Sequence, residues 1–556
     1  MSVAKEFDVF LSYTSADEAF AKRIKAALQA QNLRVWLACY EIVAGDQFPS
    51  AIELALTASS AVALLISPES LVSGWVKEEY NSAIALSHTK GMTLRLIPVL
   101  LRNADLPPFL VSRQWVDFRE ESNFNKAVEA LAAGIRGQPA SRRLNVTRTC
   151  FISSEYPPIV YGGLGIHVDK LSRALAQHVQ VDILLPDSGR EEYLHGVKGV
   201  KPVSVNVSAS YSDTASWRRF AEYVPPRVKS LASDKLPDIV HCHDWVTVLA
   251  GIKCKWLLGI PLVFHMHLPN RDPLCAYIEN LGLISADLVT VNSQFMFVEI
   301  TDRGLPVRRL QVVRNGVDTD LFHPAENWPA DGGYILFAGR LVEQKGVEYL
   351  VRAFYYVREK FPDVRLKIAG DGEFREWLER LCENLTLSGH VEFLGRQRHE
   401  DLPALYQAAR LVVVPSVFEP FGMVALEAFA CRRPVAASRV GGLREIVRHN
   451  SSGFLAEPKD HLDLAQWLMT LLSDADLRER MGTNGLGCLA EEGYTWPAVA
   501  GKFAELYEEV KQTPPKLDRP GEANGLMYRI ETVAPNSEKW EWREFLWELY
   551  KTGSAS

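Results

Sequence analysis

Short apolar runs alternate with longer amphipathic runs along most of the chain, and this alternation constrains the fold more than any other feature. Residues 61–67 (AVALLIS) are apolar up to the final serine, a pattern typical of a strand buried on both faces of a parallel sheet. Further strand-like runs occur at residues 262–269, 334–339 and 411–415. Strands that alternate with helices predict doubly wound α/β layers.

Composition narrows the classes of function. Of the 556 residues 47% are hydrophobic, and the formal net charge of −7 argues against a general nucleic-acid or membrane binder. We find no apolar run long enough to span a bilayer and no signal segment at the amino end. The eight cysteines form no C-x-x-C pair, so neither a disulfide framework nor a zinc ribbon is indicated. We therefore expect a cytoplasmic protein with no metal ion and no nucleic-acid or membrane partner.

Breaks in the pattern divide the chain into domains. The polar segment GQPASRRLN at residues 137–145 predicts a linker, and a breaker stretch at residues 329–333 predicts a hinge. Beyond a Pro-rich stretch that begins at residue 513, apolar residues recur at helical spacing, namely Trp542, Phe545, Leu546 and Leu549. We expect a first domain at residues 1–137, a linker at 138–146, two Rossmann-like halves at 147–328 and 329–512, and a linker with an amphipathic helix at 513–556.

Three segments of the first domain carry a recognisable pattern: FDVFLSYTSAD at residues 7–17, VWLACYEIVAGD at 35–46 and SGWVKEEY at 73–80. Asp17 is expected to cap the helix that follows it. These segments resemble the Toll/interleukin-1 receptor (TIR) family, which implies a flavodoxin-like α/β domain. The middle segment is similar to the BB loop of that family but departs from it at residues 38–39, which affects loop contacts and not the fold.

TIR domains act either as adaptors or as enzymes that cleave NAD+, and the enzymes resemble one another in a Trp followed four residues later by a Glu. Trp75 and Glu79 match that pattern, so the resemblance implies that Glu79 is catalytic. Helical spacing alone leaves Glu78 as an alternative, because it lies close to the same face. A fixed carboxylate can hold the ribose and stabilise the positive charge that develops as nicotinamide leaves. Tyr13, Trp36 and Trp75 are candidates for stacking on the base.

The segment FEPFGMVALE at residues 418–427 has two carboxylates with seven residues between them. If Gly422 opens a helix, the free backbone N–H groups of Gly422 and Met423 form an anion site. Glu427 can then accept two hydroxyl groups of a ribose, and Glu419 lies nearer to a sugar carried by the same phosphates. This arrangement suits a nucleotide diphosphate sugar.

Two cations and a glycine loop add to this pattern. Arg340 and Lys345 share one strand-to-helix turn and can neutralise a diphosphate leaving group. Gly162 and Gly163 follow a strand and precede a helix, where they let a backbone approach a ligand closely. Each feature also has an interpretation without function. The two cations can be solvated surface residues, and the glycines can form an ordinary turn.

Together these motifs resemble the retaining GT-B glycosyltransferases of family four and the related glycogen and starch synthases, over residues 148–511. The resemblance implies a nucleotide-sugar donor, UDP-, ADP- or GDP-linked, bound on the second half and an acceptor bound on the first. The sequence departs from bacterial glycogen synthases at Val160, where those enzymes often have a Lys. A late amphipathic segment at residues 494–510 is expected to cross back to the first half.

Four histidines follow two strand-like runs, at positions 241, 243, 265 and 267. They could form a metal cluster, but we expect them to line the crevice at the carboxyl ends of parallel strands, where open α/β sheets bind ligands. By resemblance, His267 lies near the transferred sugar and is a candidate catalytic residue, and His243 with Asp244 matches the HD of the family's HDW segment.

Three functions remain open. The first is a TIR NAD+ glycohydrolase fused to a retaining glycosyltransferase, acting as a bacterial antiviral effector that depletes NAD+ after a phage-derived trigger. The second is a sugar transferase whose TIR domain serves only for self-assembly into homo-oligomers. The third is a scaffold that binds nucleotides without turning them over.

Overall fold

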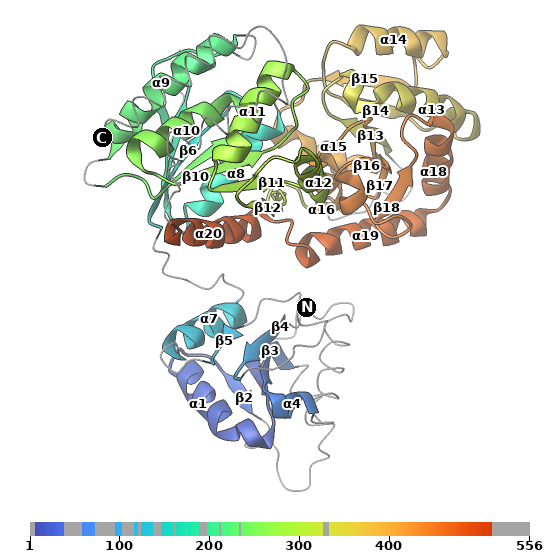
Figure 1. The fold of residues 1–556 in the computed structure, drawn as a ribbon. Coiled ribbons are helices and arrows are strands. Elements are labelled where there is room, and N and C mark those ends of the chain that lie inside the picture. Colours follow the sequence, from blue (N-terminus) through green and yellow to red (C-terminus); the bar gives the residue numbers. More distant parts are fainter. Residues whose placement is uncertain are drawn as a thin grey trace, which may run out of the picture. The chain divides into compact units, whose positions relative to one another are not determined.

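The structure is a computed structural model that describes residues 6–37, 58–72, 95–102, 116–119, 124–136, 146–160, 162–187, 197–210, 213–232, 235–325 and 333–513. The chain divides into two compact units, Met1–Arg143 and Leu144–Ser556 (Figure 1). Residues 38–46 of the predicted BB-loop segment and the predicted carboxyl-terminal helix lie outside the described residues. In the described part of the chain, no helix is both long and apolar enough to cross a membrane.

The first unit contains a five-stranded parallel sheet in the order β2-β1-β3-β4-β5. Its central strand, β3 (Ser59–Ile66), is almost wholly buried, as its uninterrupted apolar run predicts. Helices α1 (Glu18–Gln29) and α7 (Phe124–Arg136) pack their apolar faces into one core with this sheet. The other elements are β1 (Phe7–Ser12), the 3-10 turn η1 (Ser15–Asp17), β2 (Val35–Leu37), α4 (Pro68–Val72), β4 (Arg95–Leu100) and β5 (Val116–Asp117). This strand order is that of flavodoxin-like folds.

The second unit consists of two parallel sheets, each with its own helices. The first half has a seven-stranded sheet in the order β12-β11-β10-β9-β6-β7-β8. Its strands are β6 (Arg148–Ile152), β7 (Gln180–Leu185), β8 (Val200–Ser204), β9 (Ile239–His243), β10 (Leu262–Met266), β11 (Leu288–Val291) and β12 (Leu310–Val312). Its helices are α8 (Gly163–Leu175), α9 (Thr214–Leu231), α10 (Trp245–Leu258), α11 (Pro273–Ser285) and α12 (Gln294–Asp302).

The second half has a six-stranded parallel sheet in the order β15-β14-β13-β16-β17-β18. Its strands are β13 (Tyr334–Ala338), β14 (Leu366–Ala369), β15 (Val391–Gly395), β16 (Ala409–Val414), β17 (Val435–Ser438) and β18 (Gly453–Ala456). Its helical segments are η4 (Glu343–Lys345), α13 (Val347–Lys360), α14 (Arg375–Asn384), η5 (His399–Asp401), α15 (Leu402–Ala408), α16 (Met423–Ala430), α17 (Leu443–Ile446), α18 (His461–Ser473) and α19 (Ala475–Glu491). Both halves are therefore Rossmann-like, as the strand and helix alternation predicts.

The last described helix, α20 (Trp496–Gln512), returns to the first half and packs beside α8 (Figure 1). Trp496, Phe503 and Tyr507 are buried in one cluster with residues of β6, β7 and α8. Burial of each such side chain stabilises the fold by roughly 1.5–3 kcal/mol. Val146, which the sequence places in the linker, is also buried in this cluster, and its backbone N–H donates a 2.6 Å hydrogen bond to Glu508.

Candidate functional site

The segment between β16 and α16 holds Glu419, the carboxylate predicted at the sugar, against Lys345, one of the two cations predicted at the diphosphate. The Nζ atom of Lys345, at the end of η4, lies 2.7 Å from Oε2 of Glu419. Ser416, which is 1% exposed, donates a 3.0 Å hydrogen bond to the same oxygen. Helix α16 begins at Met423 with Gly422 as its N-cap residue, and the φ of Gly422 is 122°, a value that favours glycine. An ion pair and a helix amino end are therefore adjacent in the sequence and in the fold.

Glu427 lies within α16 and is buried. Its Oε2 accepts a 2.6 Å hydrogen bond from the hydroxyl of Tyr406 on α15. Burial raises the pKa of Glu427 to about 7, although the hydrogen bond from Tyr406 opposes this shift. The carboxyl group is thus held in place and poised between its neutral and ionised forms near neutral pH.

Glycines of a neighbouring turn close over the backbone of the same segment. The N–H of Gly442 donates a 2.9 Å hydrogen bond to the carbonyl oxygen of Glu419. A Cβ atom at Gly441 would lie 2.0 Å from that oxygen, so only glycine fits there. Arg340, just after β13, is exposed and forms no hydrogen bond or ion pair with any residue that the structure describes. Its guanidinium group is available to an anion.

The glycine loop of the first half is open at its tip and tight behind it. A Cβ atom at Gly162 or Gly163 would meet nothing within 4 Å. At Gly165, by contrast, a Cβ atom would lie 2.9 Å from the side chain of Val160. Arg396, which follows β15, donates a 2.8 Å hydrogen bond to the carbonyl oxygen of Val160. A cation of the second half therefore reaches the loop in which the expected Lys is missing.

His267 follows β10 and is held from both sides. Its backbone N–H donates a 2.9 Å hydrogen bond to Oδ1 of Asp244, and its carbonyl oxygen accepts one of 3.0 Å from Nδ2 of Asn292. Its ring nitrogen Nε2 lies 3.3 Å from Nδ1 of His243. Burial is the main cause that raises the pKa of Asp244 to about 7.

The prediction that all four histidines line the crevice is wrong for three of them. His241, His243 and His265 are 0% exposed, and only His267 is partly exposed. Alternate positions on β9 and β10 share one face, as predicted, but helices α8 and α20 cover that face. Sequence spacing fixes the face of a strand and does not reveal which helix packs on it.

Contacts between the two halves connect the predicted residues. Asn292, which holds His267, is followed by Ser293, and Oγ of Ser293 donates a 2.6 Å hydrogen bond to the carbonyl oxygen of Pro420. His267 and Glu419 are thus linked across the two halves by two side chains that are neighbours in sequence. The side chain of Met423 packs against the core clusters of both halves.

A carboxylate of the second half also binds the start of α12 in the first half. The backbone N–H groups of Gln294 and Phe295 donate hydrogen bonds of 2.9 and 2.8 Å to the two oxygens of Glu445. Amino ends of helices favour such a negative charge. These contacts join the two halves of the second unit.

In the first unit, the structure describes only part of the predicted site. Trp75 and Glu79 lie outside the described residues. Tyr13 is half-buried beside the apolar core. Trp36 is 4% exposed, and its ring stacks on Phe10 with 4.7 Å between the ring centroids. This packing supports a core role for Trp36 and does not support its predicted role of stacking on a base.

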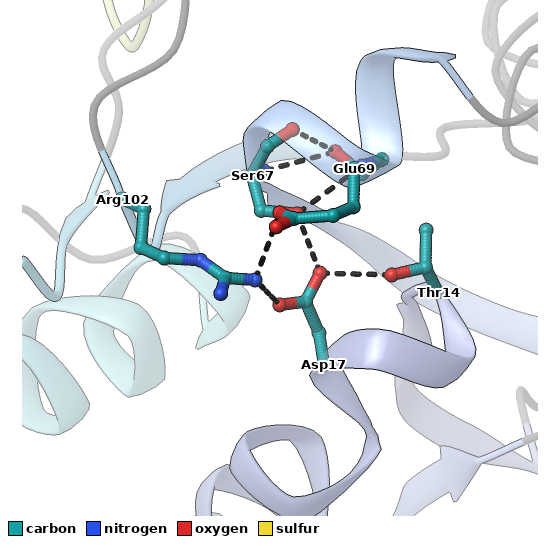
Figure 2. A network of polar contacts seen from close by, with 6 residues as sticks. Thr14, Asp17, Ser67, Glu69 and Arg102 are labelled. Carbon is teal, nitrogen blue, oxygen red and sulfur yellow. Dashed lines mark hydrogen bonds and ion pairs between the residues drawn. The ribbon is translucent and has the colours of Figure 1, made fainter.

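A buried polar network lies at the carboxyl ends of β1, β3 and β4 (Figure 2). Asp17 precedes α1 but makes no side-chain capping bond, which corrects the expectation from the sequence. Its Oδ2 instead accepts hydrogen bonds of 2.9 Å from Thr14 and 2.6 Å from Ser67, and Oδ1 pairs with Arg102. Arg102 also lies 3.0 Å from Glu69. The carboxylate of Asp17 thereby joins three strand ends.

Several of these residues escape sequence reasoning because their residue types are ordinary and their partners are distant in the chain. Tyr406 is 21 positions from Glu427, and Glu445 is about 150 positions from the helix end it binds. Gly165 carries the one available signal, since it belongs to the same glycine-rich turn as Gly162 and Gly163.

Three family models match the chain. The model described as TIR domain matches residues 9–132, Glycosyltransferase Family 4 matches residues 161–321, and Glycosyl transferases group 1 matches residues 318–486. These matches follow the order of domains predicted from the motifs.

Relatives and solved structures match the same part of the chain. An uncharacterized glycosyltransferase of Methanocaldococcus jannaschii is 33% identical over 386 residues, which are 65% of this chain and 98% of that protein. A glycogen synthase of Mycobacterium tuberculosis is 30% identical over 395 residues, 66% of this chain and 95% of that protein. The structure of sucrose-phosphate synthase from Thermosynechococcus elongatus is 26% identical, with a TM-score of 0.60 over 66% of this chain and 99% of that one.

The motifs, the paired Rossmann-like sheets and these matches agree, and the chain belongs to the family-four GT-B glycosyltransferases, with a TIR domain at its amino end.

Proposed function

We propose that the second unit transfers a sugar from a nucleotide diphosphate donor with retention of configuration, and that the TIR domain hydrolyses NAD+. The observation that carries the transferase proposal is the Lys345–Glu419 pair beside the amino end of α16. A partly buried cation next to free backbone N–H groups is suited to a diphosphate.

In this proposal the donor lies on the second half. Its phosphates contact the N–H groups of Gly422 and Met423, with Arg340 and Lys345 supplying positive charge. When the bond between the sugar carbon and the phosphate oxygen breaks, that oxygen gains negative charge. A fixed cation therefore stabilises the transition state more strongly than it stabilises the intact donor. Glu427 accepts the ribose hydroxyl groups.

The reacting sugar would then lie near Glu419 and His267, and the acceptor enters past Gly162 and Gly163. The hydrogen bonds of Asn292 and Ser293 support this arrangement, because they link the backbone of His267 to the segment that carries Glu419. The nucleoside of the donor is uridine, adenosine or guanosine.

The experiment is incubation of the full chain with UDP-, ADP- and GDP-sugars and oligosaccharide acceptors, with all products identified by mass spectrometry. Release of a nucleoside diphosphate together with an extended acceptor supports the proposal. No donor consumption with any of the nucleotide sugars contradicts it.

For the TIR domain, the proposal that NAD+ is cleaved is supported by the Trp75 and Glu79 motif, since a fixed carboxylate stabilises the cationic ribose as nicotinamide leaves. The test is nicotinamide release by the full chain. We expect Glu79→Ala to abolish release and the adjacent Glu78→Ala to retain most of it. Equal loss in both variants, or release that persists in Glu79→Ala, contradicts this assignment.

We further propose that the protein is an antiviral effector that depletes NAD+ on infection, with homo-oligomers forming through the TIR domains. The feature in favour is the joining of a TIR domain to a second catalytic module in one chain. Cells that express the wild-type chain should lose NAD+ and resist phage, and cells that express Glu79→Ala should do neither. If both variants assemble alike and resist phage alike without loss of NAD+, the TIR domain serves only for self-assembly.

A further inference from the structure

Five imidazole side chains meet in the interior of the first half, between the sheet and helices α8 and α20. They are His167 of α8, His241 and His243 of β9, His265 of β10, and His267. The rings of His265 and His267 have centroids 4.4 Å apart, and those of His167 and His267 are 4.5 Å apart. Such a density of buried imidazoles exceeds what sugar transfer requires, since only His267 is partly exposed.

Buried nitrogens in this group lack partners. The Nε2 atoms of His167, His241, His243 and His265 are buried and have no hydrogen-bond partner among the residues that the structure describes. Leaving a buried polar atom unpaired costs about 1–3 kcal/mol. Several buried ring nitrogens at one place therefore lack a partner, at a cost to the stability of the fold. A ligand bound between them would supply that partner.

For His167, the partner of the other ring nitrogen determines which atom holds the lone pair. Nδ1 of His167 lies 3.0 Å from Oδ1 of Asn315. An amide oxygen only accepts, so Nδ1 carries the proton and Nε2 carries the lone pair. Nδ1 of His265 lies 2.8 Å from the hydroxyl of Thr290, which leaves Nε2 of His265 facing inward as well. Outer partners of this kind orient the imidazole ligands of metals.

Burial also keeps these rings neutral. It lowers the pKa of His167 to about 3 and holds the pKa values of His265 and His267 well below the usual 6.5.

We propose that His167, His265 and His267 bind a borderline divalent transition-metal ion, with zinc or cobalt as the fitting class. One nitrogen of each residue lies within 4.8 Å of the others. In a tetrahedral zinc site with bonds of about 2.0–2.1 Å, ligand nitrogens stand roughly 3.3 Å apart. Metal binding would therefore draw these nitrogens together by up to about 1.5 Å, through small ring shifts about χ2, a torsion with a broad energy minimum in histidine.

Neutral imidazoles without a carboxylate ligand suit zinc, cobalt, nickel or copper and exclude calcium and magnesium, which prefer oxygen. Three protein ligands would leave a fourth position for water or another small ligand. Since the proposed function places His267 beside the donor sugar, a bound metal withdraws that ring, and added metal should inhibit sugar transfer reversibly. This consequence alone rests on the proposed function, and the binding test below does not.

The test uses the full chain without an affinity tag, stripped with a chelator and then titrated with Co2+. We expect the visible absorption of tetrahedral cobalt at about one ion per chain, and displacement of that signal by Zn2+. His265→Gln should abolish the absorption. The matched control is His241→Gln, which lies in the same group but outside the three ligands and retains a side chain that can bond Tyr507.

A milder variant covers the case in which His265→Gln does not fold. Thr290→Val keeps the shape of the side chain but removes the hydroxyl that orients His265, and it should weaken cobalt binding about 10- to 100-fold. The proposal is overturned if the wild-type chain gives no tetrahedral cobalt spectrum, or if His241→Gln and His265→Gln bind the metal equally well.

Discussion

Nζ of Lys345 lies 2.7 Å from Oε2 of Glu419, so the cation proposed to meet the donor phosphates is held at the crevice by a carboxylate. Replacing Lys345 with Ala removes charge that stabilises the leaving diphosphate, and we expect kcat for sugar transfer to fall roughly 100- to 1,000-fold. The measurement is nucleoside diphosphate release at saturating donor. Lys502→Ala on the exposed face of α20 is the matched control and should transfer sugar at the wild-type rate. A Lys345→Ala enzyme as fast as this control would remove Lys345 from the mechanism.

The buried carboxyl group of Glu427 should make the transferase unit sensitive to pH. Its pKa in the folded chain, about 7, lies above the usual 4.5 because burial disfavours the charged form. Its contribution to stability is therefore complete below about pH 4.5 and is lost as the pH rises to about 7. Glu427→Gln resembles the neutral form, so the drop in melting temperature between pH 5 and pH 8 should be smaller in the variant. An identical drop in both proteins would show that Glu427 does not titrate in this range.

The hydrogen bonds between Glu445 and the start of α12 should help to fix the position of one half of the transferase unit relative to the other. Glu445→Gln keeps the shape but removes the negative charge that favours the helix amino end, at a cost of about 1 kcal/mol. We expect a several-fold loss of kcat with little change in donor affinity, because the proposed contacts to the donor nucleotide all come from the second half. Steady-state kinetics measures kcat, and a donor-binding titration measures the donor affinity. A change confined to donor affinity would contradict this role.

Asp17 should anchor the TIR domain, because its buried carboxylate joins Thr14, Ser67 and Arg102 (Figure 2). Removing one partner of a buried pair typically costs 3–5 kcal/mol, and the exposure of Arg102 places Asp17→Ala at about the lower end of that range. We expect this variant to lower the melting temperature of the first unit only. Asp8→Ala is the control, since its pair with Arg34 is exposed and its loss should lower the melting temperature less.

The fold follows closely from the sequence, and the candidate site follows only in part. Alternating strands and helices determine parallel sheets, because apolar runs such as 61–67 have no other way to be buried. The Glu419 segment can be recognised in the sequence because a glycine, a proline and two carboxylates lie within ten residues of one another. Tyr406 and Ser293 were not found, because an ordinary hydroxyl becomes informative only when the fold places it beside a distant partner. Asp17 was misjudged for the same reason, since Ser67 and Arg102 compete with the local helix for its carboxylate.

The return of α20 to the first half has a consequence for how the chain is made. Trp496, Phe503 and Tyr507 fill the interior of a sheet whose first strand is synthesised more than three hundred residues earlier, as the positions of β6 and α20 require. During translation part of one face of that sheet stays uncovered until α20 leaves the ribosome. A protein cut between the two halves would therefore yield an amino-terminal fragment prone to aggregation, and co-expression of the missing piece should restore its solubility.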